Sequence, residues 1–307
     1  MKKFIITVDT EGDNLWAWKP GEEITTENTK YIPRFQDLCE KYGFCPVYLT
    51  NNEMVESDQF CAFLKEKASE NKCEVGMHLH AWNTQPEYAL KKEYSGLPYI
   101  TEYPEEIIYK KHLYLKQKIE DKTGVSPVSY RAGRWATNES LFKVLEQLGF
   151  TGDCSVTPGI SWSNCEGLTV PSGNDYSSAN NKPYRISENI VEVPLTSAKF
   201  RTFYGNGMKQ LIKNSIFGVA GMLRPAVASL EIMKRTALHV EKSGNDYLEF
   251  MIHSSELMPG GSPYFKSEEE IELLYSIMQK YFGWISENGY EGISLSDYID
   301  DWNKKNM

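Results

Sequence analysis

Two pairs of polar residues, each spaced two apart, are the clearest candidates for chemistry in this sequence. Asp9 and Glu11 form one pair, and His78 and His80 form the other. Residues i and i+2 of an extended chain project to the same side, so each pair can point into one pocket. Two histidines and a carboxylate make an open site for a divalent metal, with room for water and substrate. A second carboxylate that does not bind the metal can take a proton from that water.

Further along the chain, an arginine and a histidine follow apolar segments. Arg131 opens the stretch Arg-Ala-Gly-Arg-Trp, which includes Arg134 and Trp135, and it can hold a carboxylate by a two-pronged ion pair. His253, three residues before Glu256, can act as a general acid. Each residue also has a structural alternative, as a cap, a packing group or part of a salt bridge. Together they favour a single functional site.

The elements that must position these residues alternate between strand and helix. Apolar, β-branched runs predict strands, and segments with helical spacing between them predict helices. The strands are expected at 4–8, 46–50, 73–78, 128–131, 150–155, 190–195 and 247–252, with a short element at 291–295. The helices are expected at 27–42, 57–71, 104–122, 138–148 and 267–287. This alternation predicts an α/β fold, an irregular (β/α) barrel of about seven parallel strands.

Five of these strands end in polar residues: Asp9, His78, Arg131, Asp153 and His253. Parallel α/β barrels carry their functional sites at the carboxyl edge of the strands. The five residues are therefore expected to meet in one place.

Two segments interrupt the alternation within what we expect to be a single domain over residues 1–307. The segment 156–188 is a long loop rich in Ser, Asn, Gly and Pro, and it contains Trp162, Asp175 and Tyr176. Aromatic rings among short polar side chains suit sugar recognition, so this loop is expected to form one wall of a substrate cleft. An ordinary surface excursion is the alternative. The segment 206–243 is expected to be an inserted pair of helices.

Composition and charge exclude several classes of protein. The net charge is −9 and no run of Lys and Arg is present, which argues against a nucleic-acid partner. The six cysteines form no C-x-x-C pair, and no apolar run is long enough to anchor the chain in a membrane. The apolar run at the N-terminus is too short for a signal peptide. We therefore expect a cytoplasmic protein with reduced thiols.

Several stretches resemble the motifs of the polysaccharide deacetylase superfamily (carbohydrate esterase family 4), whose catalytic domains are similar to the nodulation chitooligosaccharide deacetylase. Residues 7–12 resemble the first motif, T-F-D-D-G, and residues 74–78 resemble the lead into the metal histidines. Residues 130–135 resemble the arginine motif, 150–155 the strand of the fourth motif, and 251–253 the last motif. The resemblance covers most of the chain in order.

A finer resemblance is to a branch of this superfamily encoded with O-antigen and other surface-polysaccharide genes. The stretches 173–176, 183–184 and 253–257 carry it. It implies an enzyme that hydrolyses the N-acetyl group of an amino sugar or glycan precursor.

The resemblance implies a role for each candidate residue. A divalent metal, zinc by expectation, would bind at Glu11, His78 and His80. Asp9 would activate water, Arg131 would orient Asp9, and His253 would protonate the leaving amine. The residues expected to bind substrate are Trp82, Arg134, Trp135, Asp153, Asp175, Tyr176 and Glu256.

The chain departs from the superfamily pattern at two points. The usual adjacent Asp pair is replaced by Asp9-Thr10-Glu11, so the roles of Asp9 and Glu11 can be exchanged. The second metal histidine usually lies four residues after the first, but Trp82 stands there and His80 falls two residues short. Either His80 replaces the lost ligand, or the metal is weakly held or absent. The sequence therefore leaves two further readings open: a hydrolase of another C–N bond, such as a formyl-sugar or ureide, and an inactive carbohydrate-binding relative.

Overall fold

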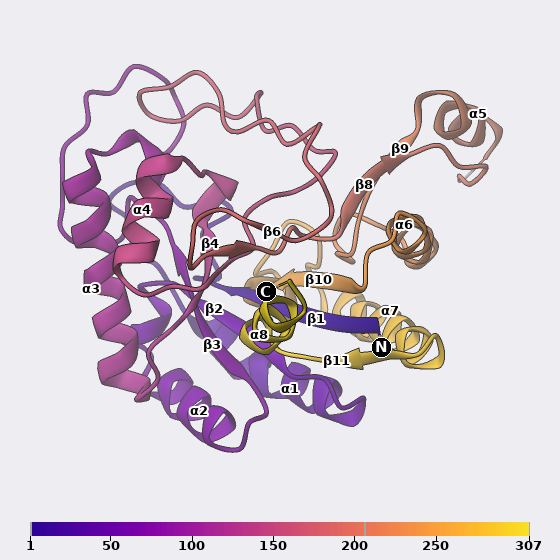
Figure 1. Ribbon diagram of the computed structural model, residues 1–307, viewed down its shortest axis with the longest axis horizontal. Coiled ribbons are helices and arrows are strands. Elements are labelled where there is room, and N and C mark those ends of the chain that lie inside the picture. Colours follow the sequence, from indigo (N-terminus) through magenta and orange to yellow (C-terminus); the bar gives the residue numbers. More distant parts are fainter. Residues whose placement is uncertain (1, 206, 307) are drawn as a thin grey trace.

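A curled, mostly parallel β-sheet forms the centre of the molecule (Figure 1). The computed structural model describes residues 2–205 and 207–306. Over these residues the main sheet runs in the order β10-β1-β2-β3-β4-β5-β7-β6, and β11 pairs with the start of β1. The strands are β1 (Lys2–Thr10), β2 (Pro46–Thr50), β3 (Glu74–Leu79), β4 (Ser129–Ala132), β5 (Gly152–Asp153), β6 (Tyr184–Arg185), β7 (Val191–Glu192), β10 (Tyr247–His253) and β11 (Tyr290–Gly292).

The described strand pairs of this sheet are parallel, except for β6 with β7. The sheet curls into a half-barrel, which confirms the predicted irregular (β/α) architecture. The helices are α1 (Ile32–Lys41), α2 (Asp58–Ser69), α3 (Glu105–Thr123), α4 (Glu139–Gln147), α5 (Met208–Phe217), α6 (Leu230–Lys242), α7 (Glu268–Glu287) and α8 (Leu295–Asn306). Short 3-10 turns lie at η1 (Glu27–Tyr31), η2 (Met54–Glu56), η3 (Ile100–Glu102), η4 (Gly133–Trp135) and η5 (Ser254–Leu257).

Local sequence signals set several helix ends. The side chains of Ser57, Asn138 and Ser267 accept hydrogen bonds from backbone N–H groups in the first turns of α2, α4 and α7. These bonds satisfy donors that a helix N-terminus leaves unpaired. Helix α3 ends at Gly124, whose φ of 75° is a left-handed conformation that glycine adopts at low cost.

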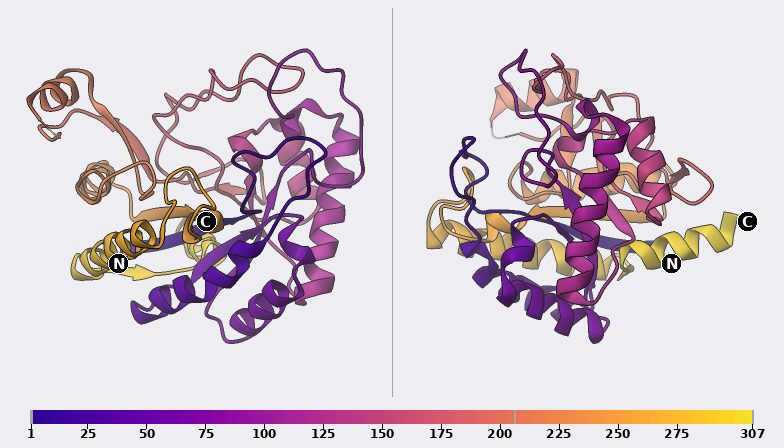
Figure 2. Two further views of the ribbon diagram at one scale, coloured as in Figure 1. Left: turned by 180° about the vertical axis from the view of Figure 1, so that it is seen from behind. Right: turned by 90° about the vertical axis from the view of Figure 1, so that its left-hand side faces the viewer.

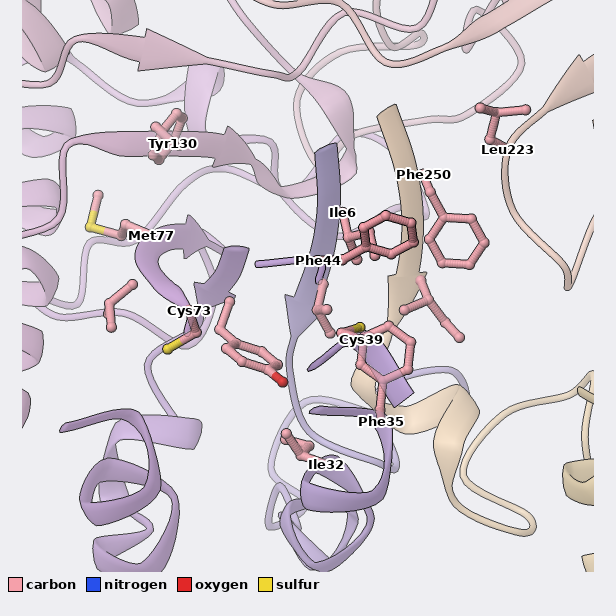
Figure 3. Packing of buried hydrophobic residues seen from close by; sticks show 14 of the residues in the cluster. Ile6, Ile32, Phe35, Cys39, Phe44, Cys73, Met77, Tyr130, Leu223 and Phe250 are labelled. Carbon is pink, nitrogen blue, oxygen red and sulfur yellow. The ribbon is translucent and has the colours of Figure 1, made fainter. Parts of the chain in front are cut away.

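The outer face of the sheet packs against helices and forms the main core. Alternate residues of β1, among them Ile6, join this core with Phe250 of β10 and Phe35 of α1. Figure 3 shows these side chains gathered around Phe44, between the strands and α1. Because strand residues alternate between faces, the remaining residues of β1 must point to the inner face of the half-barrel.

The inner face is apolar at one end of the strands and polar at the other. Ile5 of β1 and Val47 of β2 pack with Tyr298 of α8, which lies across the sheet in Figure 1. The same alternation carries Asp9, four residues beyond Ile5, to the inner face at the carboxyl end of β1. Helix α8 thus fills one end of the half-barrel and leaves the other end open for a site.

A small antiparallel sheet, β8 (Ser197–Phe200) with β9 (Val219–Met222), carries helix α5 away from the body of the protein (Figure 1). The helical pair predicted for 206–243 is therefore present as α5 and α6, but β9 separates the two helices. Its four residues pair with β8 along their whole length, and this long-range pairing was not predicted. Asn206, the first residue of the predicted insertion, lies outside the described residues. Among the helices of the described residues, none combines the length and apolar character needed to cross a membrane.

Candidate active site

Three possible metal ligands meet at the carboxyl edge of the sheet. Glu11 follows β1, His78 lies in β3 and His80 follows β3; their ligand atoms lie within 4.8 Å of one another, and all three residues are buried. The Glu11 Oε2 atom lies 3.5 Å from His78 Nε2 and 3.3 Å from His80 Nε2. The two Nε2 atoms are 3.1 Å apart. Both ring nitrogens therefore face one carboxylate oxygen, as the paired spacing predicts.

The second nitrogen of each ring decides how well this cluster fits a metal. The Nδ1 of His78 donates to the carbonyl oxygen of Arg131 at 3.0 Å, so its Nε2 is free to act as a ligand. The Nδ1 of His80 lies 3.0 Å from the side-chain nitrogen of Asn51, whose oxygen accepts from the Asn52 N–H at 2.7 Å. His80 can use Nε2 for a metal only when the Asn51 amide turns its oxygen toward the ring. The donor set thus fits a divalent metal after one amide rotation.

Asp9 lies beside this cluster and is held by Arg131. The Arg131 guanidinium contacts Asp9 Oδ1 at 2.5 Å, donates to Thr7 Oγ1 at 2.9 Å and also pairs with Glu249. Arg131 and Glu249 are fully buried, and Asp9 is almost so. One arginine therefore bridges two carboxylates on the inner face of β1 and β10, which fixes the orientation of Asp9.

His253, at the end of β10, completes the group. Its Nε2 lies 3.8 Å from Asp9 Oδ2 and 3.6 Å from Glu11 Oε1. Its Nδ1 lies 3.7 Å from Glu256, which in turn pairs with Arg224. The imidazole is thus surrounded by three carboxylates, which would stabilise a proton that it receives during a reaction.

Burial and neighbouring charge shift the pKa of each of these groups. Burial alone would raise the pKa of Asp9, but Arg131, His78 and His253 together bring it well below its usual value. Burial raises the pKa of Glu11, and His78 opposes this effect. For His253, burial and then the Arg224 charge hold the pKa well below its usual value. At neutral pH, Asp9 is therefore ionised and His253 is neutral.

The site opens into a cavity of about 500 Å³, which is large enough for a sugar unit. Its floor includes Asp9, His78 and His253. Of the residues expected to bind substrate, Trp82, Arg134 and Trp135 line the cavity. Residues of the long 156–188 loop, Trp162 and Cys165, line it too, so the loop forms part of the same wall.

Trp82 does not stand among the three possible ligands. Its ring lies flat against His80, with ring centroids 4.3 Å apart and planes 21° from parallel. It therefore covers one side of the His80 ring and leaves the cluster intact.

A left-handed turn forms the cavity wall after β4. Arg134 and Trp135 both have positive φ, 58° and 61°, a conformation that costs non-glycine residues about 1 kcal/mol or more each. Hydrogen bonds from Arg134 to backbone oxygens, including that of Glu166 at 2.8 Å, hold one half of the turn. Tyr176 donates to the Trp135 carbonyl at 2.7 Å and holds the other half. The turn positions the Trp135 ring, which stacks on Trp162 with centroids 6.0 Å apart.

Four of the residues expected to bind substrate do not line the cavity: Asp153, Asp175, Tyr176 and Glu256. Asp153 is fully buried and accepts a hydrogen bond from Ser155 Oγ at 2.7 Å. Asp175 is exposed and accepts from the Ser177 N–H at 3.0 Å. Tyr176 fixes the Trp135 turn, and Glu256 holds Arg224. Each of these four side chains has a partner within the protein, and its expected role in substrate binding stays a prediction.

Sequence reasoning missed several residues of the site. Three of them line the cavity: Arg224, Trp16 and Tyr264. The fourth, Glu249, forms an ion pair with Arg131. Glu249 could have been recognised in the sequence, because it is a single charged residue within the apolar strand Tyr247–His253. Arg224 follows an unpredicted strand and left no comparable signal.

The chain has the fold of the polysaccharide deacetylases. It matches a provisionally assigned polysaccharide deacetylase from Mycobacterium smegmatis with a TM-score of 0.58 and 13% identity, over 100% of this chain and 92% of that one. It also matches the 4-alpha-glucanotransferase of Thermococcus litoralis with a TM-score of 0.54 and 13% identity, over 97% of this chain and 40% of that one. No protein-family model and no curated protein matches the sequence. At this level of identity the structural likeness shows the fold, and the chemistry has to be argued from the site.

Proposed function

We propose that this protein is a metal-dependent hydrolase that removes the N-acetyl group of an amino sugar. The observation that carries the proposal is the buried group of Glu11, His78 and His80, with Asp9 and His253 beside it. A carboxylate and two imidazoles suit zinc, and the site lies at the open end of the half-barrel. The resemblance of residues 173–176, 183–184 and 253–257 supports a role in surface-polysaccharide biosynthesis, and the expected cytoplasmic location favours a nucleotide- or lipid-linked precursor as the substrate.

Each residue has a defined task in this reaction. A divalent cation held by Glu11, His78 and His80 would supply Lewis acidity for the amide carbonyl and for water. Asp9, kept ionised by Arg131, accepts a proton from the attacking water. The water oxygen forms a bond to the carbonyl carbon, the C–N bond breaks, and the amine nitrogen needs a proton.

His253 delivers that proton, although it is neutral in the resting site. Asp9 Oδ2 lies 3.8 Å from His253 Nε2, so the proton that Asp9 takes from water can pass to His253. The three surrounding carboxylates stabilise the imidazolium while it exists. Asp9 and His253 thus act as a relay that conserves one proton, and the products are acetate and a free amine.

The 500 Å³ cavity gives the substrate two aromatic surfaces. Trp16 lies on the His253 side, with ring centroids 5.2 Å apart, and the Trp135–Trp162 stack lies on the loop side. Flat apolar rings suit the carbon faces of a sugar, while Arg134 and Arg224 can bond its oxygens.

Product analysis tests this proposal directly. The zinc-loaded protein is incubated with N-acetylated and N-formylated amino sugars and with a ureide, and released acetate, formate and ammonia are measured. Acetate is expected, and it should disappear in His78→Ala but persist in His239→Gln, which changes an exposed histidine on α6. Formate or ammonia without acetate would indicate a different C–N hydrolase. Sugar binding without any release would indicate a non-catalytic relative, and either result overturns the proposal.

A further inference from the structure

The arm formed by β8, α5 and β9 carries an unusual concentration of exposed apolar side chains. Figure 1 and the left view of Figure 2 show α5 held away from the body of the protein. Of the twelve large hydrophobic residues that are exposed in the described part of the chain, five lie in the fifteen residues from 203 to 217. Their exposed fractions are Phe203 80%, Met208 73%, Ile212 48%, Ile216 53% and Phe217 69%. A cluster of this kind marks an interaction surface.

Helix α5 presents this surface in one direction. Met208, Ile212 and Ile216 are spaced four apart and form a stripe along one side of the helix. Asn214 is the buried residue of α5, and its Nδ2 donates to the Tyr204 carbonyl at 2.7 Å. At about 100° per residue, Asn214 lies roughly 160° around the helix from Ile212. The apolar stripe therefore points away from the arm's own contacts.

The charge of this segment is of one sign. The arm, residues 197–222, contains four basic residues and no acidic residue: Lys199, Arg201, Lys209 and Lys213. Since the whole chain carries −9 and the arm carries +4, the rest of the chain carries −13. Lys209 and Lys213 lie next to the apolar stripe and are exposed. An apolar stripe flanked by lysines suits the surface of an anionic bilayer, where the stripe enters the headgroup region and the lysines meet lipid phosphates.

We propose that the arm docks this protein on the surface of a membrane that contains anionic phospholipids. A second copy of the chain fits the surface less well, because a two-fold contact through the stripe would bring lysines against lysines. The arm also leads into the active site, since Arg224 and Val227, just after β9, line the cavity. Docking would therefore hold the cavity close to substrates presented at the bilayer. This inference does not depend on which bond the active site hydrolyses.

Vesicle sedimentation tests the docking. The full protein is mixed with vesicles of phosphatidylcholine alone or of equal parts phosphatidylcholine and phosphatidylglycerol, at low and high salt. We expect binding to the anionic vesicles only, with loss at high salt because the phosphate–lysine attraction is screened. The variant K209E/K213E should bind at least about 30-fold more weakly, because two attractions are lost and two repulsions are added, and I212S/I216S should also lose binding.

Matched control variants show whether a loss of vesicle binding comes from the arm or from any change of surface charge or apolar side chains. The variant K65E/K143E makes the same charge change at two other exposed lysines, and Leu273→Ser removes an exposed apolar side chain of α7. Both controls should bind like the wild type. Failure of the wild type to bind anionic vesicles would overturn the proposal, as would equal loss in arm variants and controls. Concentration-dependent dimerisation through the arm without vesicle binding would overturn it in favour of a second copy.

Discussion

Replacing Asn51 by aspartate should strengthen the binding of zinc to this protein. The Asn51 side chain is fully buried and lies 3.0 Å from His80 Nδ1 through its nitrogen. When His80 binds a metal through Nε2, it carries its proton on Nδ1. The Asn51 side-chain nitrogen and His80 Nδ1 would then be two donors that face each other. A carboxylate removes this conflict, because either oxygen can accept from Nδ1 and the second can still accept from the Asn52 N–H.

The expected gain in zinc affinity follows from the effect of a hydrogen-bond partner on the second ring nitrogen of a metal-binding histidine. Such partners change metal affinity by about 10- to 100-fold, which is about 1.4–2.7 kcal/mol. The same change should lower the melting temperature of the metal-free protein, since it adds a buried negative charge that is uncompensated until the metal binds. Asn51→Leu should weaken zinc binding, because His80 Nδ1 then has no acceptor.

Zinc affinity is best measured by competition with a chromophoric chelator, with thermal melting of the metal-free and loaded forms alongside. Asn52→Asp is the matched control, because it adds the same charge one residue away where the side chain contacts Lys118 at 2.8 Å. The zinc affinity of Asn52→Asp should differ from that of the wild type far less than the zinc affinity of Asn51→Asp does. Equal zinc affinity for Asn51→Asp and wild type would refute the assignment of His80 Nε2 as a ligand.

Further predictions concern catalysis, substrate binding and pH. Asp9→Asn and His253→Ala should each lower acetate release roughly 10²- to 10⁴-fold while the far-ultraviolet circular dichroism stays unchanged; wild-type turnover in either would remove that residue from the relay. Trp162→Ala should raise KM about 3- to 10-fold with little change in kcat, because it removes one stacking surface from the cavity wall. The exposed Asp175→Ala is its control and should leave KM unchanged. His112→Gln should make the free energy of unfolding less dependent on pH between about 6.5 and 4.

The sign of the His112 effect follows from its burial. His112 is fully buried in α3, donates to the Ile108 carbonyl and contacts the Tyr130 hydroxyl at 3.0 Å. Burial lowers its pKa from 6.5 to about 4, so the unfolded chain binds a proton in this range before the folded protein does. Its contribution to stability is complete above pH 6.5 and is lost as the pH falls through 4, by about 3 kcal/mol in total. Chemical denaturation at several pH values measures this loss, and an equal pH dependence in wild type and His112→Gln would contradict it.

The sequence predicts the strands around the site closely because their signals are local. The second strand was expected at 46–50 and is observed at Pro46–Thr50, and the third was expected at 73–78 and is observed at Glu74–Leu79. The i, i+2 spacing then places Glu11 on the same side as Asp9 and His80 on the same side as His78, and the parallel order brings both pairs to one edge of the sheet. The cluster of possible ligands was therefore predictable from three residues and one geometric rule.

The rest depends on contacts between distant parts of the chain. The β8–β9 pairing joins residues about twenty positions apart, and the short strand Tyr184–Arg185 gave no periodic signal. Helix α8 was missed because its apolar residues pack on the inner face of the sheet, where only the three-dimensional curl of the strands creates a surface for it. The expected contacts with substrate also depend on such distant packing, and they stay predictions. Asp175 and Tyr176 lie in the right loop, but local turns direct one into solvent and the other onto the Trp135 backbone.

Glu11, His78 and His80 should together hold one functional metal ion. Native mass spectrometry of the protein, after zinc loading and removal of excess zinc, counts the ions that each chain retains. We expect one ion per chain for the wild type, and none retained by His78→Ala or Glu11→Ala, while His112→Gln and His239→Gln each keep one. A wild-type chain without zinc, or full retention by His78→Ala, would contradict it.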